Sequence, residues 1–394
     1  MADKHDLFDD RIYWKMAVSL RERGYDVYYL LIGDEVKKGI TKEGIKYEIL
    51  KIKTFSKNRY LNFILKNLNP NNNYKKLLDK AKEINADVYH FHDLWINKIG
   101  KRLKLLPQKP SVIYDVHDPF AINIKDYVGG QSKIKWLINL YADYIDHWEK
   151  RCAKQYDFII TTEENVRDRF RKVLPVEKVN VIYNYTYLHE YRKDMPKKYN
   201  LIYCGGITKF RGAIEIIEAV RILKQDFKDL KMIFLGPIFL KELKEKMIGL
   251  IKKYDLTDNI IIKNSVSYHE VIWYYNQSKI GLGIFLPIKT HKIILQIKIF
   301  EYMAMGLPIV GSNFGHINDY ILKDKVGITV NPTNPEKIAE AVKELLQNEE
   351  LYNEFKTNGI NAVEKKYTWS IMENKLFSIY DKLLAERINV TNYD

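Results

Sequence analysis

Cysteine is almost absent from this chain, since only Cys152 and Cys204 occur among 394 residues. They lie in separate apolar segments, and their spacing is neither that of a disulfide framework nor that of a zinc site. We interpret both as small buried residues. The sequence therefore predicts a fold that depends on neither disulfides nor zinc.

Long hydrophobic runs are also missing. No stretch of about 18 uninterrupted apolar residues occurs, so the sequence offers no obvious membrane-spanning helix. The first residues, MADKHDLFDDRIYWK, lack the basic start and the apolar run of a secretory signal peptide. We therefore expect a cytoplasmic protein.

Acidic residues are outnumbered by basic ones, which leaves a formal net charge of +14. Such a charge favours an anionic partner, and nucleotide phosphates, a phospholipid surface or nucleic acid would all qualify. Nucleic acid is the least favoured of the three, because the basic residues are scattered and no nucleic-acid-binding motif accompanies them. We expect no nucleic-acid partner.

The length and the pattern of the chain predict two α/β domains. At 394 residues the chain exceeds what one core usually supports. Apolar strand patterns alternate with amphipathic helix patterns in both halves, which is typical of doubly wound parallel sheets. The predicted strands are 27–33, 47–52, 87–93, 111–118, 157–163, 179–184, 200–206, 231–237, 259–264, 279–287, 307–313 and 326–331.

The predicted domain bounds follow from a polar segment in the middle of the chain. Residues 187–199 contain a proline and have no apolar periodicity, which is typical of a linker. We expect an N-terminal Rossmann-like domain over 1–188 and a second one over 196–369. A C-terminal helix would follow over 370–394.

In doubly wound sheets, ligands bind beyond the carboxyl ends of the strands. His117 and Asp118 end one predicted strand, although a lone histidine is more often structural than catalytic. Gly205 and Gly206 end another strand. Glycines permit close backbone approach, and the start of the next helix offers free N–H groups, so this loop suits a diphosphate. An ordinary tight turn would explain the same glycines.

Basic residues follow these glycines. Lys209 and Arg211 would add fixed positive charge to the loop, and Gly212 precedes the next helix pattern. The spacing is not the G-x-G-x-x-G pattern of dinucleotide-binding folds, so the segment alone is a weak signal.

The segment QIKIFEYMAMGLPIVGS, residues 296–312, predicts a helix that ends at Gly306 and leads into a strand. Lys298 and Glu301 lie three residues apart and therefore share one helix face. They are either a surface ion pair or a charged pair at the lip of a ligand cleft, and their pattern alone does not decide between the two.

The order of these segments resembles glycosyltransferase family 4, a retaining family of GT-B fold. The resemblance rests on the glycines and the basic residue of 205–212, on KIFEYMAMGLPIVGS, on YTW at 367–369, and on YHFHD, YDVHD and residues 9–30. It extends over nearly the whole chain, and EYMAMGLPIV is its most specific part. It implies two doubly wound domains facing a cleft, and a C-terminal helix that crosses back to the N-terminal domain.

The resemblance also implies roles for single residues. Glu301 matches the second glutamate of the E-x7-E motif, which accepts hydrogen bonds from the ribose of the donor. Arg211 takes the place of a basic residue that contacts the donor diphosphate. Gly206 stands where the family has an arginine, so Lys209 would substitute for that cation. His117 matches a histidine near the transferred sugar.

Further donor contacts follow from a helix that we expect to begin near residue 293. Its N-terminus would point at the diphosphate, and Thr290, His291 and Lys292 would lie in the preceding loop. Lys298 would contact the diphosphate or hold Glu301 ionised. No D-x-D triplet, the metal-binding element of the alternative GT-A fold, occurs in the sequence, so we expect no metal requirement.

The sequence departs from the family at two places. Ile293 stands where the first glutamate of E-x7-E is expected, which puts the usual contact to the donor sugar in doubt. Family members also begin with a strand ahead of the segment around His5. Here only four residues precede His5, so we expect that strand to be missing and two interior strand edges to be exposed.

The implied reaction is transfer of a sugar, with retention, from a nucleoside diphosphate to a hydroxyl of a glycan, a glycolipid or a lipid-linked precursor. His117 and Asp118 are the candidate catalytic residues. Basic and apolar residues alternate in 98–109 and 241–253, which would suit peripheral contact with the inner face of the cell membrane or merely a solvated helix face. The alternatives are a non-hydrolysing sugar-nucleotide epimerase and a catalytically impaired nucleotide-sugar-binding homologue.

Overall fold

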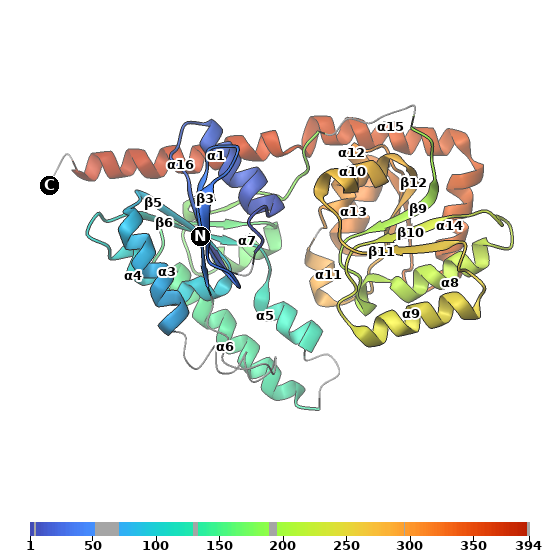
Figure 1. Cartoon of the computed structure of the whole chain (residues 1–394), viewed down its shortest axis with the longest axis horizontal. Helices are drawn as coiled ribbons and strands as arrows, with labels where there is room; N and C mark the ends of the chain where they lie inside the picture. Colours follow the sequence, from blue (N-terminus) through green and yellow to red (C-terminus); the bar gives the residue numbers. More distant parts are fainter. Residues whose placement is uncertain (4, 52–70, 129–132, 189–194, 295, 392–394) are drawn as a thin grey trace. The chain divides into compact units, whose positions relative to one another are not determined.

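The chain is a two-unit α/β protein in the computed structural model (Figure 1). The structure describes residues 1–3, 5–51, 71–128, 133–188, 195–294 and 296–391. One unit comprises Met1–Asn184 and Ser370–Asp394, and the other comprises Tyr185–Trp369. Part of the predicted linker, 189–194, lies outside the described residues.

The first unit holds eight described strands. They are β1 (Ala2–Asp3), β2 (Tyr28–Gly33), β3 (Lys37–Ile40), β4 (Lys46–Lys51), β5 (Val88–His92), β6 (Ser111–Val116), β7 (Phe158–Thr161) and β8 (Val179–Val181). Its helical segments are η1 (Asp10–Ala17), α1 (Val18–Glu22), α3 (Asn71–Ile84), η2 (Leu94–Ile96), α4 (Asn97–Lys104), α5 (Phe120–Asn123), η3 (Ile124–Val128), α6 (Lys135–Ala153), α7 (Glu164–Arg171), η4 (Val176–Lys178) and most of α16 (Trp369–Thr391).

The strands of the first unit form two parallel sets with the orders β1-β2-β4-β3 and β5-β6-β7-β8, and only the edge strand β3 is antiparallel.

The expectation that the first strand is missing is wrong in part. Ala2 and Asp3 form β1, in register with Leu31 and Ile32 of β2. Met1 continues β1 toward β5, because the N–H of His92 donates to the Met1 carbonyl at 2.9 Å.

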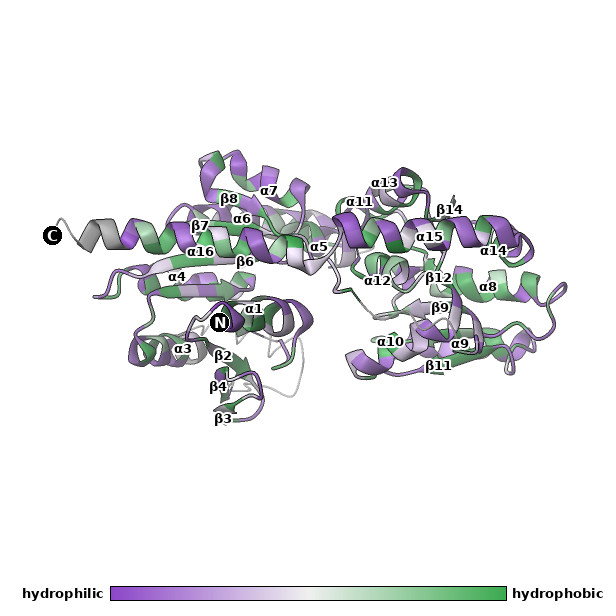
Figure 2. Cartoon of the chain, turned by 90° about the horizontal axis from the view of Figure 1, so that it is seen from above, coloured by the Kyte–Doolittle hydropathy of each residue, from purple (hydrophilic) through white to green (hydrophobic). Residues whose placement is uncertain are grey.

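Helix α16 packs on the first unit. The Tyr25 hydroxyl donates to Asp381 at 3.1 Å, and Arg387 donates to the Asp87 carbonyl at 2.7 Å. Hydrophilic and hydrophobic residues alternate along this helix, as expected for one that buries a single face (Figure 2).

The second unit is a six-stranded parallel sheet. Its strands are β9 (Tyr199–Cys204), β10 (Met232–Leu235), β11 (Ile260–Lys263), β12 (Ser278–Gly283), β13 (Ile309–Ser312) and β14 (Gly327–Val330). Its helices are η5 (Lys209–Arg211), α8 (Ala213–Leu223), α9 (Lys241–Lys253), α10 (Tyr268–Asn276), α11 (Lys289–Ile293), α12 (Lys298–Ala304), α13 (Gly315–Asp324), α14 (Pro335–Gln347) and α15 (Glu349–Lys366).

The strand order of this sheet, β11-β10-β9-β12-β13-β14, reverses direction between β9 and β12. This is the order of the doubly wound dinucleotide-binding fold, in which the ligand site lies beyond the carboxyl ends of the strands at the reversal. The fold therefore directs attention to the loop after β9 and to the segments that follow β12. Both predicted doubly wound domains are confirmed.

Candidate functional site

The loop after β9 is shaped by glycines. Gly205 has a φ of +112° and Gly212 has a φ of +64°, conformations that L side chains rarely adopt. A Cβ atom at Gly212 would also meet the Ile284 side chain at 2.4 Å. The backbone conformation therefore requires glycine at both positions. After this turn the chain passes through η5 into the N-terminus of α8.

The two basic residues of this loop are held differently. Arg211 is half-buried and donates from Nη1 to the Gly206 carbonyl at 3.1 Å, which fixes its guanidinium against the glycine turn. Lys209 is exposed, and its Nζ lies 4.7 Å from the centre of the Phe210 ring.

Helix α12 is buried along its whole length, from Lys298 to Ala304. Lys298 is 4% exposed and Glu301 is 6% exposed, so they are not a surface ion pair. The Tyr275 hydroxyl of α10 donates to Glu301 Oε2 at 2.7 Å. Tyr275, which was not predicted from the sequence, therefore holds the carboxylate of Glu301 in one position.

The ammonium of Lys298 is buried beside the glycine turn. Its Nζ lies 3.8 Å from the centre of the Tyr203 ring, and a Cβ atom at Gly205 would lie 3.3 Å from it. Among the described residues, no hydrogen-bond acceptor contacts this ammonium. Burial and the nearby charge of Arg211 lower the pKa of Lys298 to about 7, because both disfavour the charged form.

The segment before α12 differs from the expectation. Residues 289–293 form their own short helix, α11, and the next helix begins only at Lys298. The reason is the extended backbone of Ile294, whose ψ of 133° interrupts the helical path. The prediction of a helix beginning near residue 293 is therefore wrong.

His291 and Lys292 accordingly lie on α11 rather than in a loop. His291 is buried, and its Nδ1 donates to the Leu286 carbonyl at 2.9 Å. Lys292 is exposed, and its backbone lies against Gly315. The imidazole is thus held by a hydrogen bond to the segment that follows β12.

The first unit carries a second cluster, at the carboxyl ends of β5 and β6. His117 follows β6, and its Nε2 lies 3.0 Å from His92 Nδ1, so that one ring donates a hydrogen bond to the other. Thr162 donates to the His117 carbonyl at 2.9 Å. Two hydrogen bonds therefore orient His117, one at its ring and one at its backbone carbonyl.

His117 and Asp118 line one small cavity of about 200 Å³, together with His5 and Asp93. Asp118 itself is exposed. Burial disfavours the charged form of His5, but hydrogen bonds with Asp9 and Asp93 outweigh it and raise the pKa of His5 to about 10. A protonated imidazole therefore stands beside His117, with ring centres 5.4 Å apart.

A buried acidic residue anchors this cluster. Asp115 accepts hydrogen bonds from Nε and Nη2 of Arg11, both at 3.1 Å. Although burial opposes it, the Arg11 guanidinium holds the pKa of Asp115 well below its usual range. This ion pair joins η1 to β6, and its carboxylate lies beside the imidazoles of the cluster.

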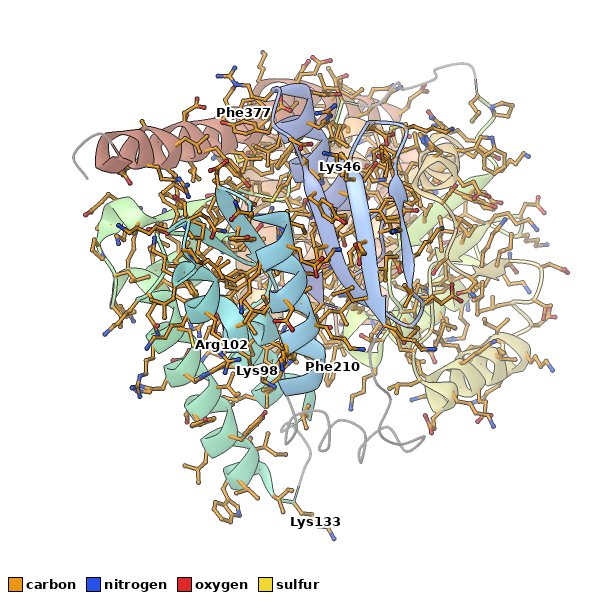
Figure 3. All side chains as sticks on the ribbon, turned by 60° about the vertical axis from the view of Figure 1, so that its left-hand side comes forward. Lys46, Lys98, Arg102, Lys133, Phe210 and Phe377 are labelled. Carbon is orange, nitrogen blue, oxygen red and sulfur yellow. The ribbon has the colours of Figure 1, made fainter. Side chains whose placement is uncertain are left out.

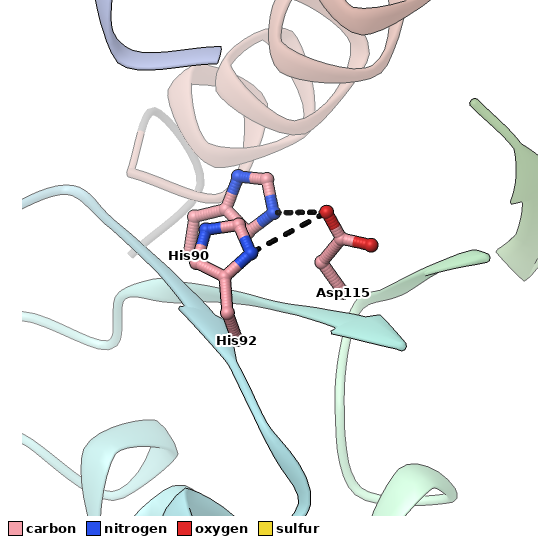
Figure 4. Close-up of side chains that lie close together, drawn as sticks. All are labelled: His90, His92 and Asp115. Atoms are coloured by element: carbon pink, nitrogen blue, oxygen red, sulfur yellow. Dashed lines mark ion pairs between the residues drawn. The ribbon is translucent and has the colours of Figure 1, made fainter. Parts of the chain in front are cut away.

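The same acidic residue belongs to a possible metal-ligand set. His90 and His92 approach one Asp115 oxygen at 3.9 and 3.4 Å (Figure 4). Imidazole and carboxylate donors suit transition metals. Here, however, the Arg11 guanidinium already binds both oxygens of Asp115, so a metal ion would be repelled by a fixed charge next to its carboxylate ligand.

Several residues of these sites were not predicted. Tyr203 and Tyr275 carry no motif that marks them, because their roles depend on strand and helix packing. Arg11 lies in residues 9–30, which the resemblance included without assigning it a role. His92 and Asp93 lie in the segment YHFHD, which the resemblance included without assigning roles to them.

Profiles of two families match the chain. The family described as “Glycosyltransferase Family 4” matches residues 11–187, and “Glycosyl transferases group 1” matches residues 190–362. A curated relative, alpha-D-kanosaminyltransferase of Streptomyces kanamyceticus, is 26% identical over 63% of this chain and 66% of its own length. An uncharacterised glycosyltransferase of Methanocaldococcus jannaschii is 21% identical over 91% of this chain and 97% of its own length.

Solved structures share the fold. Sucrose-phosphate synthase from Thermosynechococcus elongatus has a TM-score of 0.72 at 14% identity, covering 94% of this chain and 92% of that protein. Anabaena HepE, solved in complex with UDP-glucose, has a TM-score of 0.71 at 12% identity, covering 97% and 98%. Because the two family matches together span most of its length, the chain belongs to the group 1 glycosyltransferases of family 4, enzymes of GT-B fold.

Proposed function

We propose that this enzyme is a retaining glycosyltransferase that takes its sugar from a nucleoside diphosphate. Glu301 binds the ribose hydroxyls, and Arg211 and Lys298 bind the diphosphate at the glycine turn after β9. His117 orients the transferred sugar. HepE, which shares the fold, is solved in complex with UDP and UDP-glucose, which makes UDP the first nucleotide to test.

The observation that carries this proposal is the buried ammonium of Lys298. A desolvated ammonium without an acceptor is unfavourable in a protein interior. An anionic oxygen beside Gly205 would satisfy it, and Gly205 leaves room there because it has no side chain. Lys298 would then supply the second cation that the resemblance places at the position of Gly206, a role that the sequence had suggested for Lys209. The leaving diphosphate gains charge as the glycosidic bond breaks, which such fixed cations stabilise.

A thermal-shift screen with UDP, GDP, ADP and CMP tests the assignment. A ligand at about 100 times its dissociation constant stabilises the folded state by about 2.7 kcal/mol. We expect one diphosphate to raise the melting temperature, and Glu301→Gln to abolish the rise. Glu270→Gln, on the exposed start of α10, is the matched control. An equal rise in all three proteins would contradict the assignment.

We propose further that the reaction needs no metal ion. The cations of Arg211 and Lys298 would take the role that a divalent ion has in other transferases. Transfer from the donor should continue at an unchanged rate in excess EDTA. A rate that falls with EDTA and recovers with Mg²⁺ or Mn²⁺ would contradict this part of the proposal.

The acceptor is proposed to be a glycan or a lipid-linked precursor, reached from a membrane surface. The first half of α6 carries an exposed apolar face, in which Trp136 is 66% exposed and Leu140 is 58% exposed. Beside this helix, a cavity of about 480 Å³ is lined by aromatic side chains and by Lys98 and Arg102. Figure 3 shows these two cations close together and Lys133 at the far end of the same region.

Aromatic residues next to lysines suit the interface of an anionic bilayer. Of the two segments that the sequence suggested for this contact, 98–109 borders this region, whereas α9 buries Leu243, Met247 and Ile251 in the core of the second unit. Along the described part of the chain, none of the helices combines the length and apolarity needed to cross a membrane.

Co-sedimentation with vesicles of anionic or neutral lipid tests the membrane contact. We expect binding to the anionic vesicles at low salt, and a loss of binding when Trp136 and Leu140 are both changed to Ser. Leu322→Ser, which alters an equally exposed leucine on α13, should leave binding intact. Absence of binding by the unaltered enzyme would contradict the proposed contact.

A further inference from the structure

An aromatic cavity lies between three helical parts of the first unit. It measures about 480 Å³, within the range of about 300–1,000 Å³ that is typical of small-molecule sites. Its walls come from α3, from η2 with α4, and from the middle of α6, and all of these belong to the same unit. Five of its lining residues are aromatic: Tyr74, Trp95, Tyr141, Tyr144 and Trp148.

The charged side chains of this lining are all basic. Lys75, Lys98 and Arg102 line the cavity, and among the described residues no acidic side chain does so (Figure 3). Asp143 and Asp146, on the adjoining part of α6, form ion pairs with basic side chains that do not line the cavity. By charge complementarity, the cavity therefore favours an anionic ligand.

Aromatic rings hold one of these cations in place. Lys98 Nζ lies 4.8 Å from the centre of the Trp95 ring and 5.4 Å from the centre of the Tyr74 ring. The face of an aromatic ring is electron-rich and attracts an ammonium group. These rings keep the ammonium at the cavity wall without neutralising its charge, because they carry no net charge themselves.

An apolar face of α6 continues from the cavity toward the start of the helix. Leu137, Tyr141, Tyr144 and Trp148 follow one another at intervals of three or four residues, so they share one face of the helix. Tyr144 is 64% exposed, and Leu137 is also exposed. An apolar chain that leaves the cavity along this face would cover surface that is otherwise in contact with water.

Trp95 connects this cavity with the proposed catalytic cluster. Its side chain lines both the aromatic cavity and the smaller cavity of His117. The Trp95 ring lies edge-on to Phe120 of the smaller cavity, with ring centres 5.6 Å apart, and its centre lies 6.2 Å from that of Trp148. A ligand in the aromatic cavity is therefore separated from the His117 cavity by one side chain.

We propose that the aromatic cavity binds the phosphate group of an amphiphilic phosphate ester, as the anchoring end of the acceptor. Lys98 and Arg102 bind the phosphate oxygens, and the apolar chain of the ester lies along α6. The hydroxyl that receives the sugar then lies beyond Trp95, in the cavity of His117. This inference rests on the proposed acceptor class, and it adds the position and the charge of the anchoring group.

The two halves of the site exclude simpler ligands. An uncharged glycan would leave the cations of the cavity without a counter-charge. An inorganic anion would leave the apolar face of α6 exposed to water. Only a ligand that joins an anionic group to an apolar chain uses both features.

Calorimetric titration with decyl phosphate, below the concentration at which it forms micelles, tests the site. We expect one molecule to bind per chain. Lys98→Gln and Arg102→Gln should each weaken binding about tenfold or more, because a hydrogen bond between charged groups is lost. Lys101→Gln is the matched control, since Lys101 is exposed on the same helix and does not line the cavity. An equal loss of affinity in Lys101→Gln and Arg102→Gln would overturn the proposal.

Three further probes identify the chemistry of the ligand. Octyl phosphate should bind about tenfold more weakly than decyl phosphate, because two fewer methylene groups are buried. Inorganic phosphate and decyl maltoside should bind more weakly still, since the first lacks the apolar chain and the second lacks the charge. Inorganic phosphate that binds as tightly as decyl phosphate would overturn the assignment to an amphiphile. Equally tight binding of decyl maltoside would overturn the role of the cations.

Failure of this site and failure of the proposed donor site give different results. UDP should raise the melting temperature with or without decyl phosphate, because the proposed nucleotide contacts belong to the other unit. A protein that is stabilised by UDP but does not bind decyl phosphate would overturn only the phosphate ester site. A protein that binds decyl phosphate but is stabilised by none of the nucleotides would overturn the proposed donor site instead.

Discussion

At the scale of single residues, Lys298 combines a structural cost with a proposed binding role. Its ammonium is buried over the ring of Tyr203 and has no hydrogen-bond acceptor among the described residues. Methionine has a similar length and no charge. We expect Lys298→Met to raise the melting temperature of the ligand-free enzyme by about 2 °C or more, because a buried charge is removed.

The same substitution should weaken UDP binding by about 10 to 100-fold, since hydrogen bonds to charged groups contribute about 1.5–3 kcal/mol. Calorimetric titration measures this loss. A variant that is both less stable and unchanged in affinity would show that Lys298 supports the fold and has no part in binding.

The lowered pKa of Lys298 predicts a pH dependence. Between pH 7 and the ordinary lysine value of 10.5, the folded state has lost this proton and the unfolded state keeps it. The free energy of unfolding therefore rises with pH in this window. We expect the stability advantage of Lys298→Met over the unaltered enzyme to shrink from pH 7 to pH 9.

The affinity for the nucleotide should change with pH in the direction opposite to the free energy of unfolding. A diphosphate favours the charged form of Lys298, so its binding takes up a proton above pH 7, and the affinity falls as pH rises to 9. Titrations in buffers of different ionisation enthalpy measure this uptake. If the Lys298→Met variant took up as many protons on nucleotide binding as the unaltered enzyme, the proton would belong to another group.

At the scale of elements, the buried pair of Arg11 and Asp115 joins η1 to β6. Removal of one partner leaves an uncompensated buried charge, which costs about 3–5 kcal/mol. We expect Asp115→Asn to lower the free energy of unfolding by this order in urea denaturation. The double variant Arg11→Met with Asp115→Leu should recover much of the loss. A double variant no more stable than Asp115→Asn would contradict the charge argument.

The elements were more predictable than their contacts. Every predicted strand is present, because parallel strands buried on both faces leave a strong apolar signal. The short edge strand β3 was missed, since Lys37–Ile40 is exposed and has no such signal. The break at Ile294 was missed because apolar residues continue through it, so hydrophobicity alone did not separate α11 from α12.

The candidate site was predictable where a motif marks it. Glu301, Gly205 and Arg211 lie in segments with recognisable spacing. Tyr275, which holds Glu301, comes from a helix whose apolar pattern looks like that of any core helix. Strand β1 could not be predicted, because a strand of two residues has no periodicity, and only its pairing with Leu31 and Ile32 identifies it.

At the scale of the whole molecule, the division into two units separates the proposed tasks. The proposed nucleotide contacts all come from Tyr185–Trp369, whereas the His117 cluster belongs to the other unit. We therefore expect UDP alone to slow hydrogen exchange in the loop after β9 and in α12, and to leave β6 unchanged. Protection confined to β6 would reverse the assignment of tasks.

The most direct test of the central claim is a crystal structure of the enzyme with bound UDP. The account predicts a ribose hydroxyl within hydrogen-bonding distance of Glu301 and a diphosphate oxygen within hydrogen-bonding distance of Lys298 Nζ, beside Gly205. A nucleotide bound elsewhere, with Lys298 still lacking an acceptor, would contradict it.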